Sequence, residues 1–218
     1  MKYFKLVALI VLVCFIVLFG WGSYVVIDAR QKTQQTFNEL LSFQKNKLNL
    51  ADMSEDRIQK LLIIEDPNFY NHHGIDFSTP GAGLTTITQG MVKYLYFDRF
   101  KPGFMKIKQT LIAWLAVDPI VSKDDQLTVY LNTAYLGMDG NKEVKGFADA
   151  AMTYFGKQFV ELSDDEYLSL VAMIIQPNQF NVKYRPEQNR ARVEKIKRVI
   201  SGEYQPRGLR DVYYGQGN

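Results

Sequence analysis

An uninterrupted run of uncharged residues near the N-terminus constrains this chain more than any other feature. The 22 residues from Leu6 to Ile27 carry no charge and are mostly apolar. As a helix rising about 1.5 Å per residue, such a run crosses a hydrocarbon core of about 30 Å. A cleaved signal peptide is the alternative, but its apolar region is usually only about 7–15 residues long. Trp21 and Tyr24 are instead typical of a membrane interface. We therefore predict an uncleaved membrane anchor over residues 1–28.

The remainder of the chain has the composition of one folded domain. Apolar residues make up 47% and charged residues 22% of the 218 residues, which excludes a disordered protein. The single cysteine, Cys14, excludes a disulfide framework or a multi-cysteine metal cluster. Basic side chains concentrate in residues 183–210, so the net charge of +3 reflects a local patch. That patch is predicted as a solvated helix face or as a surface for anionic lipid, and no nucleic-acid partner is expected.

Apolar periodicity and helix-capping residues predict a mainly α fold. A polar, Gln-rich stalk is expected over residues 29–53, one domain over 54–200 and a tail over 201–218. Strand signals are weak along the whole chain. The expected helices of the domain are bounded by Ser54 and Pro67, Thr86 and Phe97, Met105 and Val117, Ser122 and Tyr135, and Ser163 and Pro177.

Glu65 is a candidate general base. It lies seven residues after Ile58 and so extends an apolar stripe that also contains Leu61 and Leu62. Desolvation and a nearby helix C-terminus both favour the protonated carboxyl, which is how a glutamate becomes a base near neutral pH. The alternative is a helix-end glutamate turned into solvent.

A second candidate group lies on the helix that follows Gly81-Ala82-Gly83. Thr86, Gln89 and Lys93 fall on one helix face at spacings of three and four residues. A hydroxyl, an amide and an ammonium beside a helix N-terminus can hold a diphosphate or a sugar. The alternative is an ordinary solvated face. The Gly-x4-Gly-Lys spacing of a Walker loop is absent.

Four ordered segments carry a family resemblance. Residues 65–76 read EDPNFYNHHGID, residues 85–93 read TTITQGMVK, and residues 122–137 read SKDDQLTVYLNTAYLG. Gly146-Phe147-Ala148 and Gln176-Pro177 follow in the same order. Over residues 54–200 the pattern resembles the peptidoglycan glycosyltransferases of glycosyltransferase family 51. These are the monofunctional transglycosylases and the glycosyltransferase domains of class A penicillin-binding proteins.

The resemblance implies a lysozyme-like helical domain, anchored in a bacterial cytoplasmic membrane with its catalytic part outside the cytoplasm. Members of this family polymerise the disaccharide of lipid II, invert the anomeric centre and release undecaprenyl diphosphate. The implied partners are lipid II, the nascent glycan chain, the membrane and other cell-wall synthases.

The resemblance also carries roles onto individual residues. It implies that Glu65 deprotonates the acceptor C4 hydroxyl. A divalent cation, Mg²⁺ or Mn²⁺, is a possible cofactor. The protein itself is expected to offer no metal ligands, because the only histidines are the adjacent His72 and His73, which point apart. The implied substrate-binding residues are Asp66, Phe69, His72, Thr86, Gln89, Lys93, Lys106 and Asn132.

The third motif departs from the family pattern R-K-x-x-E. Met105 replaces the arginine and Gln109 the second essential glutamate, while the stretch from Glu65 to Gln89 is shorter than in the family. A glutamine can form hydrogen bonds but cannot hold a proton or a cation as a carboxylate does. The sequence therefore predicts a polymerase whose activity is in doubt. The alternatives are an impaired relative that binds lipid II or serves as a scaffold for a synthase, and a lytic muramidase that uses Glu65 as an acid.

Overall fold

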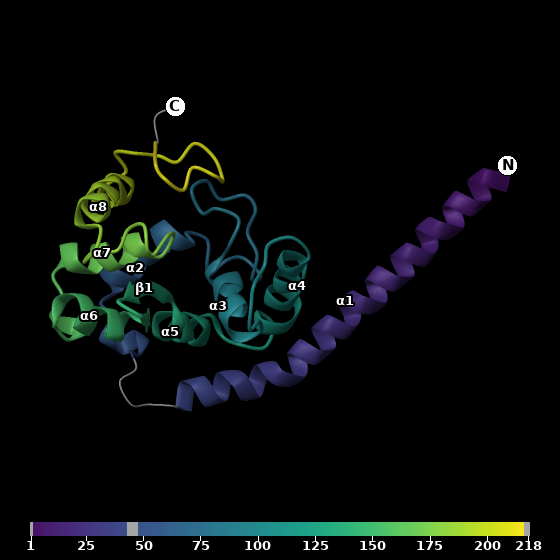
Figure 1. Cartoon of the computed structure of the whole chain (residues 1–218), viewed down its shortest axis with the longest axis horizontal. Helices are drawn as coiled ribbons and strands as arrows, with labels where there is room; N and C mark the ends of the chain where they lie inside the picture. Colours follow the sequence, from purple (N-terminus) through teal and green to yellow (C-terminus); the bar gives the residue numbers. More distant parts are fainter. Residues whose placement is uncertain (1, 43–47, 216–218) are drawn as a thin grey trace.

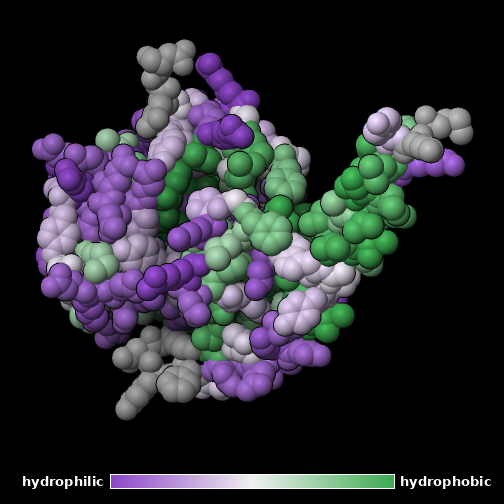
Figure 2. All heavy atoms as spheres, turned by 45° about the vertical axis from the view of Figure 1, so that its right-hand side comes forward, coloured by the Kyte–Doolittle hydropathy of each residue, from purple (hydrophilic) through white to green (hydrophobic). Residues whose placement is uncertain are grey.

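The computed structural model describes residues 2–42 and 48–215, and begins with one long helix, α1 (Lys2–Ser42). The N-terminal half of α1 projects away from the rest of the molecule (Figure 1). Figure 2 shows hydrophobic side chains along this half, and residues such as Leu12 and Phe15 are exposed. In the described part of the chain, α1 is the one helix long and apolar enough to cross a membrane. The predicted N-terminal apolar helix is thus confirmed.

The C-terminal half of α1 packs against the domain. Val25, Ala29, Thr33 and Phe37 recur at every fourth residue, and each is buried. The Thr33 hydroxyl also forms a 2.7 Å hydrogen bond with the Tyr96 hydroxyl. The boundary expected at residue 28 falls inside this continuous helix, and most of the predicted stalk is docked on the domain. Residues 43–47 of that stalk lie outside the described residues.

The domain is built mainly from helices, as predicted. Ser54, Ser122 and Ser163 each cap a helix by accepting a hydrogen bond from the backbone N–H three residues later. A π-helical turn, Ala113–Val117, continues α4, and short 3-10 turns lie at Leu50–Asp52 and Phe159–Glu161. The helices are α2 (Glu55–Glu65), α3 (Ile87–Leu95), α4 (Phe104–Ile112), α5 (Lys123–Thr133), α6 (Phe147–Phe155), α7 (Asp164–Met173) and α8 (Pro186–Ile200).

A small hairpin corrects the sequence prediction after α5. The helix expected to reach Tyr135 ends at Thr133, and Tyr135 begins β1 (Tyr135–Asp139). This strand pairs antiparallel with β2 (Lys142–Lys145), with Met138 opposite Glu143. Asp139-Gly140 is a turn signal typical of hairpins, and Gly140 has the positive φ of +60° that such a turn requires. The prediction overlooked this dipeptide.

The core lies between α5, α6 and α7. The side chains of Leu127, Leu131, Phe147, Tyr167 and Leu170 have no solvent exposure. Helix α3 packs against α5, and α8 packs against both α7 and α2. This arrangement places the C-terminal end of α2 close to α3 and α8, where a cavity opens.

Candidate active site

A cavity of about 440 Å³ lies where α2 ends and α3 begins. Its walls come from α2, the loop before α3, α3 itself, the end of α5, α8 and residues 210–214. Among the described lining residues, three are cations and one is a carboxylic acid, so the net charge of the lining is positive whether that acid is neutral or ionised. The charged and phenolic lining side chains are Glu65, Lys93, Arg192, Arg210, Tyr94, Tyr130, Tyr135 and Tyr214.

Glu65 is the last residue of α2, and its side chain is partly buried in the cavity wall. Burial raises the pKa of Glu65 to about 7. The Arg192 guanidinium opposes this shift, and the neighbouring Asp66 carboxylate adds to it. A carboxyl with this pKa can release or accept a proton near neutral pH, which is the requirement for a general base or acid. The shift has the direction expected from the sequence.

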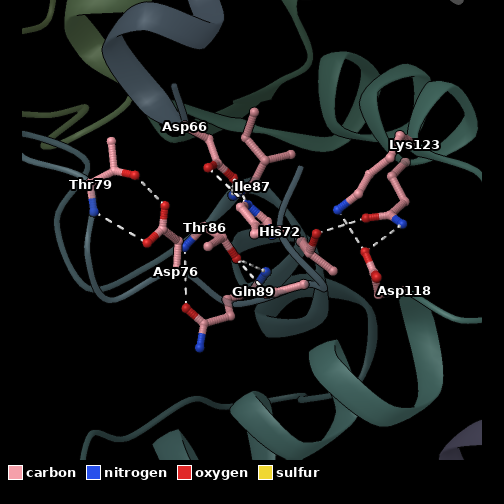
Figure 3. Close-up of polar contacts among 12 residues, drawn as sticks. Asp66, His72, Asp76, Thr79, Thr86, Ile87, Gln89, Asp118 and Lys123 are labelled. Carbon is pink, nitrogen blue, oxygen red and sulfur yellow. Dashed lines mark hydrogen bonds and ion pairs between the residues drawn. The ribbon is translucent and has the colours of Figure 1, made fainter. Parts of the chain in front are cut away.

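Asp66 lies behind the cavity wall and ties α2 to α3. Its carboxylate is buried and lies 2.9 and 3.0 Å from His72 Nε2 (Figure 3). The Ile87 backbone N–H donates a 2.9 Å hydrogen bond to the same carboxylate. Phe69, which is fully buried, meets the His72 ring edge-on. Asp66, Phe69 and His72 therefore support the wall that carries Glu65, and their predicted contact with substrate stays a prediction.

A capping box at the start of α3 separates Gln89 from the other two residues of the predicted group, Thr86 and Lys93. Thr86 is the N-cap, and its hydroxyl accepts the Gln89 N–H at 3.1 Å while the Gln89 side chain accepts the Thr86 N–H at 3.2 Å (Figure 3). Gln89 is consequently fully buried and also donates to the Thr110 hydroxyl. Thr86 and Lys93 line the cavity, but Gln89 is not among its lining residues.

Gln109 lies in the packing between α4 and α3. Its side chain is buried, and its Nε2 group donates a hydrogen bond to the backbone carbonyl of Gln89. Its Oε1 atom has no hydrogen-bond partner in the part of the chain that the structure describes. An ionised glutamate has no donor for the Gln89 carbonyl, so an amide suits this position.

Lys106 does not line the cavity but contacts a residue that does, whereas Asn132 lies away from the cavity. The Lys106 ammonium donates to the hydroxyl of Thr85, a lining residue, at 2.9 Å. Burial and, to a smaller extent, the nearby Lys93 ammonium together lower the pKa of Lys106 to about 8. Asn132 instead brackets the backbone of Leu48, accepting from its N–H at 2.9 Å and donating to its carbonyl at 2.8 Å.

Sequence reasoning missed Arg192 as a site residue. It is buried on α8, lines the cavity, and lies with its guanidinium carbon 4.5 Å from the centre of the Tyr214 ring. Its Nε and Nη1 atoms have no hydrogen-bond partner among the described residues. Arg192 shares the buried stripe of α8 with Asn189 and Ile196, at spacings of three and four residues. This periodicity is the sequence signal from which the burial of Arg192 could have been predicted.

Sequence comparisons with known proteins match most of this chain to one family. A family model described as Transglycosylase matches residues 32–201, from the docked half of α1 to the end of α8. Penicillin-binding protein 1B of Buchnera aphidicola is 38% identical over 137 residues, which cover 57% of this chain and 18% of that protein. Penicillin-binding protein 1B of Escherichia coli is 33% identical over 143 residues, or 60% and 17% of the two chains. The match thus spans less than a fifth of these two relatives.

A shorter relative matches over more of its own length. A Cupriavidus necator protein whose name describes it as a transglycosylase is 30% identical over 163 residues. The match covers 66% of this chain and 68% of that protein.

Proposed function

The chain belongs to the transglycosylase family, and on that basis we propose that it polymerises lipid II into glycan strands with release of undecaprenyl diphosphate. In this reaction the acceptor C4 oxygen bonds to the anomeric carbon of the donor, with inversion. The bond from that carbon to the diphosphate breaks, and its electron pair leaves with the diphosphate. The hydroxyl proton passes to Glu65.

One observation carries this proposal: a carboxyl with a pKa near 7 shares a cavity with three cations. At neutral pH a substantial fraction of Glu65 is ionised and can accept the hydroxyl proton. Lys93, Arg192 and Arg210 supply positive charge for the negative charge that develops on the departing diphosphate. The two requirements of the reaction, a base and a stabilised leaving group, are both met in one site.

The N-terminal helix supports a site next to a membrane. The Trp21 ring packs on Phe104 of α4 with ring centres 4.4 Å apart, so the end of the exposed apolar half of α1 contacts the domain. We place this protein in the bacterial cytoplasmic membrane with a single span and the cavity on the outer side. Lipid II and the growing glycan are the partners at the cavity, and other cell-wall synthases are candidates at the membrane.

The cavity does not fit a resident divalent cation. A divalent cation held by the protein alone needs several oxygen ligands, but Glu65 is the one carboxyl among the described lining residues. No group of three or more His, Cys, Asp or Glu side chains suited to a metal occurs in the described ranges. The proposed reaction therefore uses no cation held by the protein's own side chains.

The test is polymerisation of labelled lipid II by the full-length protein in detergent, with products resolved by gel. Glu65→Gln keeps the shape of the side chain but removes the base, and should reduce chain formation by about 100-fold or more. Glu55→Gln is the matched control, because Glu55 is exposed in the first turn of the same helix. Equal chain formation by wild type and Glu65→Gln would overturn the proposal.

The packing of Gln109 favours a second candidate function, a lipid II-binding scaffold protein without turnover. Its amide is engaged with Gln89, and no carboxylate is present at the position of the family's second glutamate. Lipid II binding without chain formation by the wild type would favour this function. The double variant Met105→Arg, Gln109→Glu separates the two cases, because an impaired enzyme should gain turnover and a dedicated binder should not.

A further inference from the structure

Residues 203–215, hereafter the 203–215 segment, lie beyond the family match yet form one wall of the cavity. The segment, yellow in Figure 1, folds back against the loop that precedes α3. Two backbone hydrogen bonds of 2.9 Å join them, from the Gly81 N–H to the Gly208 carbonyl and from the Gly83 N–H to the Leu209 carbonyl. At its far end, the Tyr214 hydroxyl donates to the Ile64 carbonyl at 3.2 Å. The segment therefore bridges the loop and α2.

The contact between the loop and the segment is close. A Cβ atom on Gly81 would lie 2.7 Å from Pro206, and one on Gly83 would lie 3.1 Å from Val212. Both glycines have positive φ angles, which side chains rarely adopt. Tyr214 itself has a positive φ of +54°, a conformation that persists in a non-glycine residue where the surroundings hold it. The 203–215 segment therefore packs against the loop too closely to allow a side chain at Gly81, and it leaves little room for one at Gly83.

Hydrogen bonds within the segment fix the backbone next to Arg210. The Asp211 carboxylate accepts the Tyr204 hydroxyl at 2.6 Å, the Arg207 N–H at 3.0 Å and the Gly215 N–H at 3.2 Å. Arg210 precedes this carboxylate and lines the cavity. Within the described ranges its side chain has no hydrogen bond or ion pair, and it is exposed at the mouth. It is free to meet a ligand.

The charges of the cavity indicate an anionic ligand. Arg192 holds two buried nitrogen atoms without hydrogen-bond partners in the described structure. Lys93 and Arg210 add two more cations to the same lining, against the single carboxyl of Glu65. Leaving these buried nitrogen atoms without acceptors is costly, and the oxygen atoms of a phosphate group would satisfy them. A planar guanidinium binds a phosphate through two parallel hydrogen bonds.

We propose that the 203–215 segment is a substrate-binding element and that Arg210 binds the diphosphate of the donor, supplying a guanidinium that the third motif lacks at Met105. This inference rests on the proposed function for the identity of the diphosphate. The segment is hydrogen-bonded to the loop between Glu65 and Gln89, and the two together form this side of the cavity.

The test compares Arg210→Ala, Arg210→Lys and the control Arg207→Ala in the full-length protein. Arg207 is exposed on the same segment but does not line the cavity. Three quantities are measured: the KM and kcat for lipid II, and the Kd for undecaprenyl diphosphate. Arg210→Ala should raise KM and Kd by about 10-fold, and Arg210→Lys should raise them less, because an ammonium keeps the charge but loses the paired hydrogen bonds. Equal values for Arg210→Ala and Arg207→Ala would overturn the inference.

The two readouts separate this inference from the proposed function. If the wild type forms no glycan but binds undecaprenyl diphosphate in an Arg210-dependent manner, the polymerase proposal fails and the binding segment stands. If the wild type polymerises lipid II and Arg210→Ala does not differ from the control, only the role of the segment fails. If the wild type does not bind undecaprenyl diphosphate, the inference is also overturned. The unfolding midpoint of each variant confirms that an exposed substitution has left the fold intact.

Discussion

Replacing Glu65 with glutamine should stabilise the folded protein above neutral pH and leave its stability nearly unchanged in acid. In the folded state the pKa of Glu65 is about 7, against an ordinary value of 4.5. Below the ordinary value the carboxyl is neutral in both the folded and the unfolded state, so it resembles glutamine. Between the two values the unfolded chain ionises first, and the folded state loses stability as the pH rises. Above the folded value the loss is complete.

The size of this effect follows from the shift. Each unit of pKa difference corresponds to about 1.4 kcal/mol, so the ionised Glu65 destabilises the fold by roughly 3 kcal/mol at alkaline pH. For a chain of this length each kcal/mol moves the melting temperature by about 2–4 °C. Glu65→Gln should therefore melt roughly 6–12 °C above the wild type at alkaline pH, and the gap should close in acid.

The assay is thermal unfolding in detergent, followed by circular dichroism, for both proteins across a series of pH values. Glu55→Gln provides the control, because Glu55 is exposed and its carboxylate accepts a hydrogen bond from Gln59. The polymerisation rate should fall as the pH is lowered through the same range, since the base must be ionised to accept a proton. A melting difference that does not vary with pH would refute the reasoning that burial controls this carboxyl.

Two further predictions concern packing. Gln109→Glu should lower the free energy of unfolding by about 1–3 kcal/mol at neutral pH, because the Gln89 carbonyl loses its donor and faces a carboxylate; an unchanged denaturant midpoint would contradict this. Phe37→Ala should lower it by about 3–5 kcal/mol, because the ring is buried between α1 and the domain. Asn38→Ala, an exposed neighbour on α1, should have little effect, and equal protease sensitivity of the two variants would show that α1 is not docked there.

Features set by neighbouring residues could be predicted from the sequence. The serines that cap α2, α5 and α7 act on backbone groups three residues away, and the structure confirms each of them. The environment of Glu65 also followed from a local pattern, its place at the end of an apolar stripe. The burial of the Gln89 side chain could also have been predicted, because Thr86-x-x-Gln89 matches the sequence of a capping box.

Features that depend on distant segments could not be predicted in this way. Periodicity along α8 indicates that Arg192 is buried, but only the packing of α8 and the 203–215 segment brings Arg192 and Arg210 to the cavity that Glu65 lines. The docking of α1 is a similar case. The polar residues around Thr33 suggest a stalk in water, but one residue in four faces the domain and is buried.

Helix α1 is continuous, so no loop or flexible linker separates its exposed apolar part from the docked residues between Val25 and Phe37. With the uncharged run from Leu6 to Ile27 in a bilayer, as proposed, its 22 residues span about 33 Å as a helix, and Trp21 and Val25 near its end also pack on the domain. A helix longer than the local bilayer thickness tilts. Because the helix is fixed to the domain, that tilt turns the domain with it, and the mouth of the cavity changes its angle to the lipid surface. Bilayer thickness would then set the angle between the cavity and a lipid-linked substrate. A flexible linker between the helix and the domain would remove this dependence.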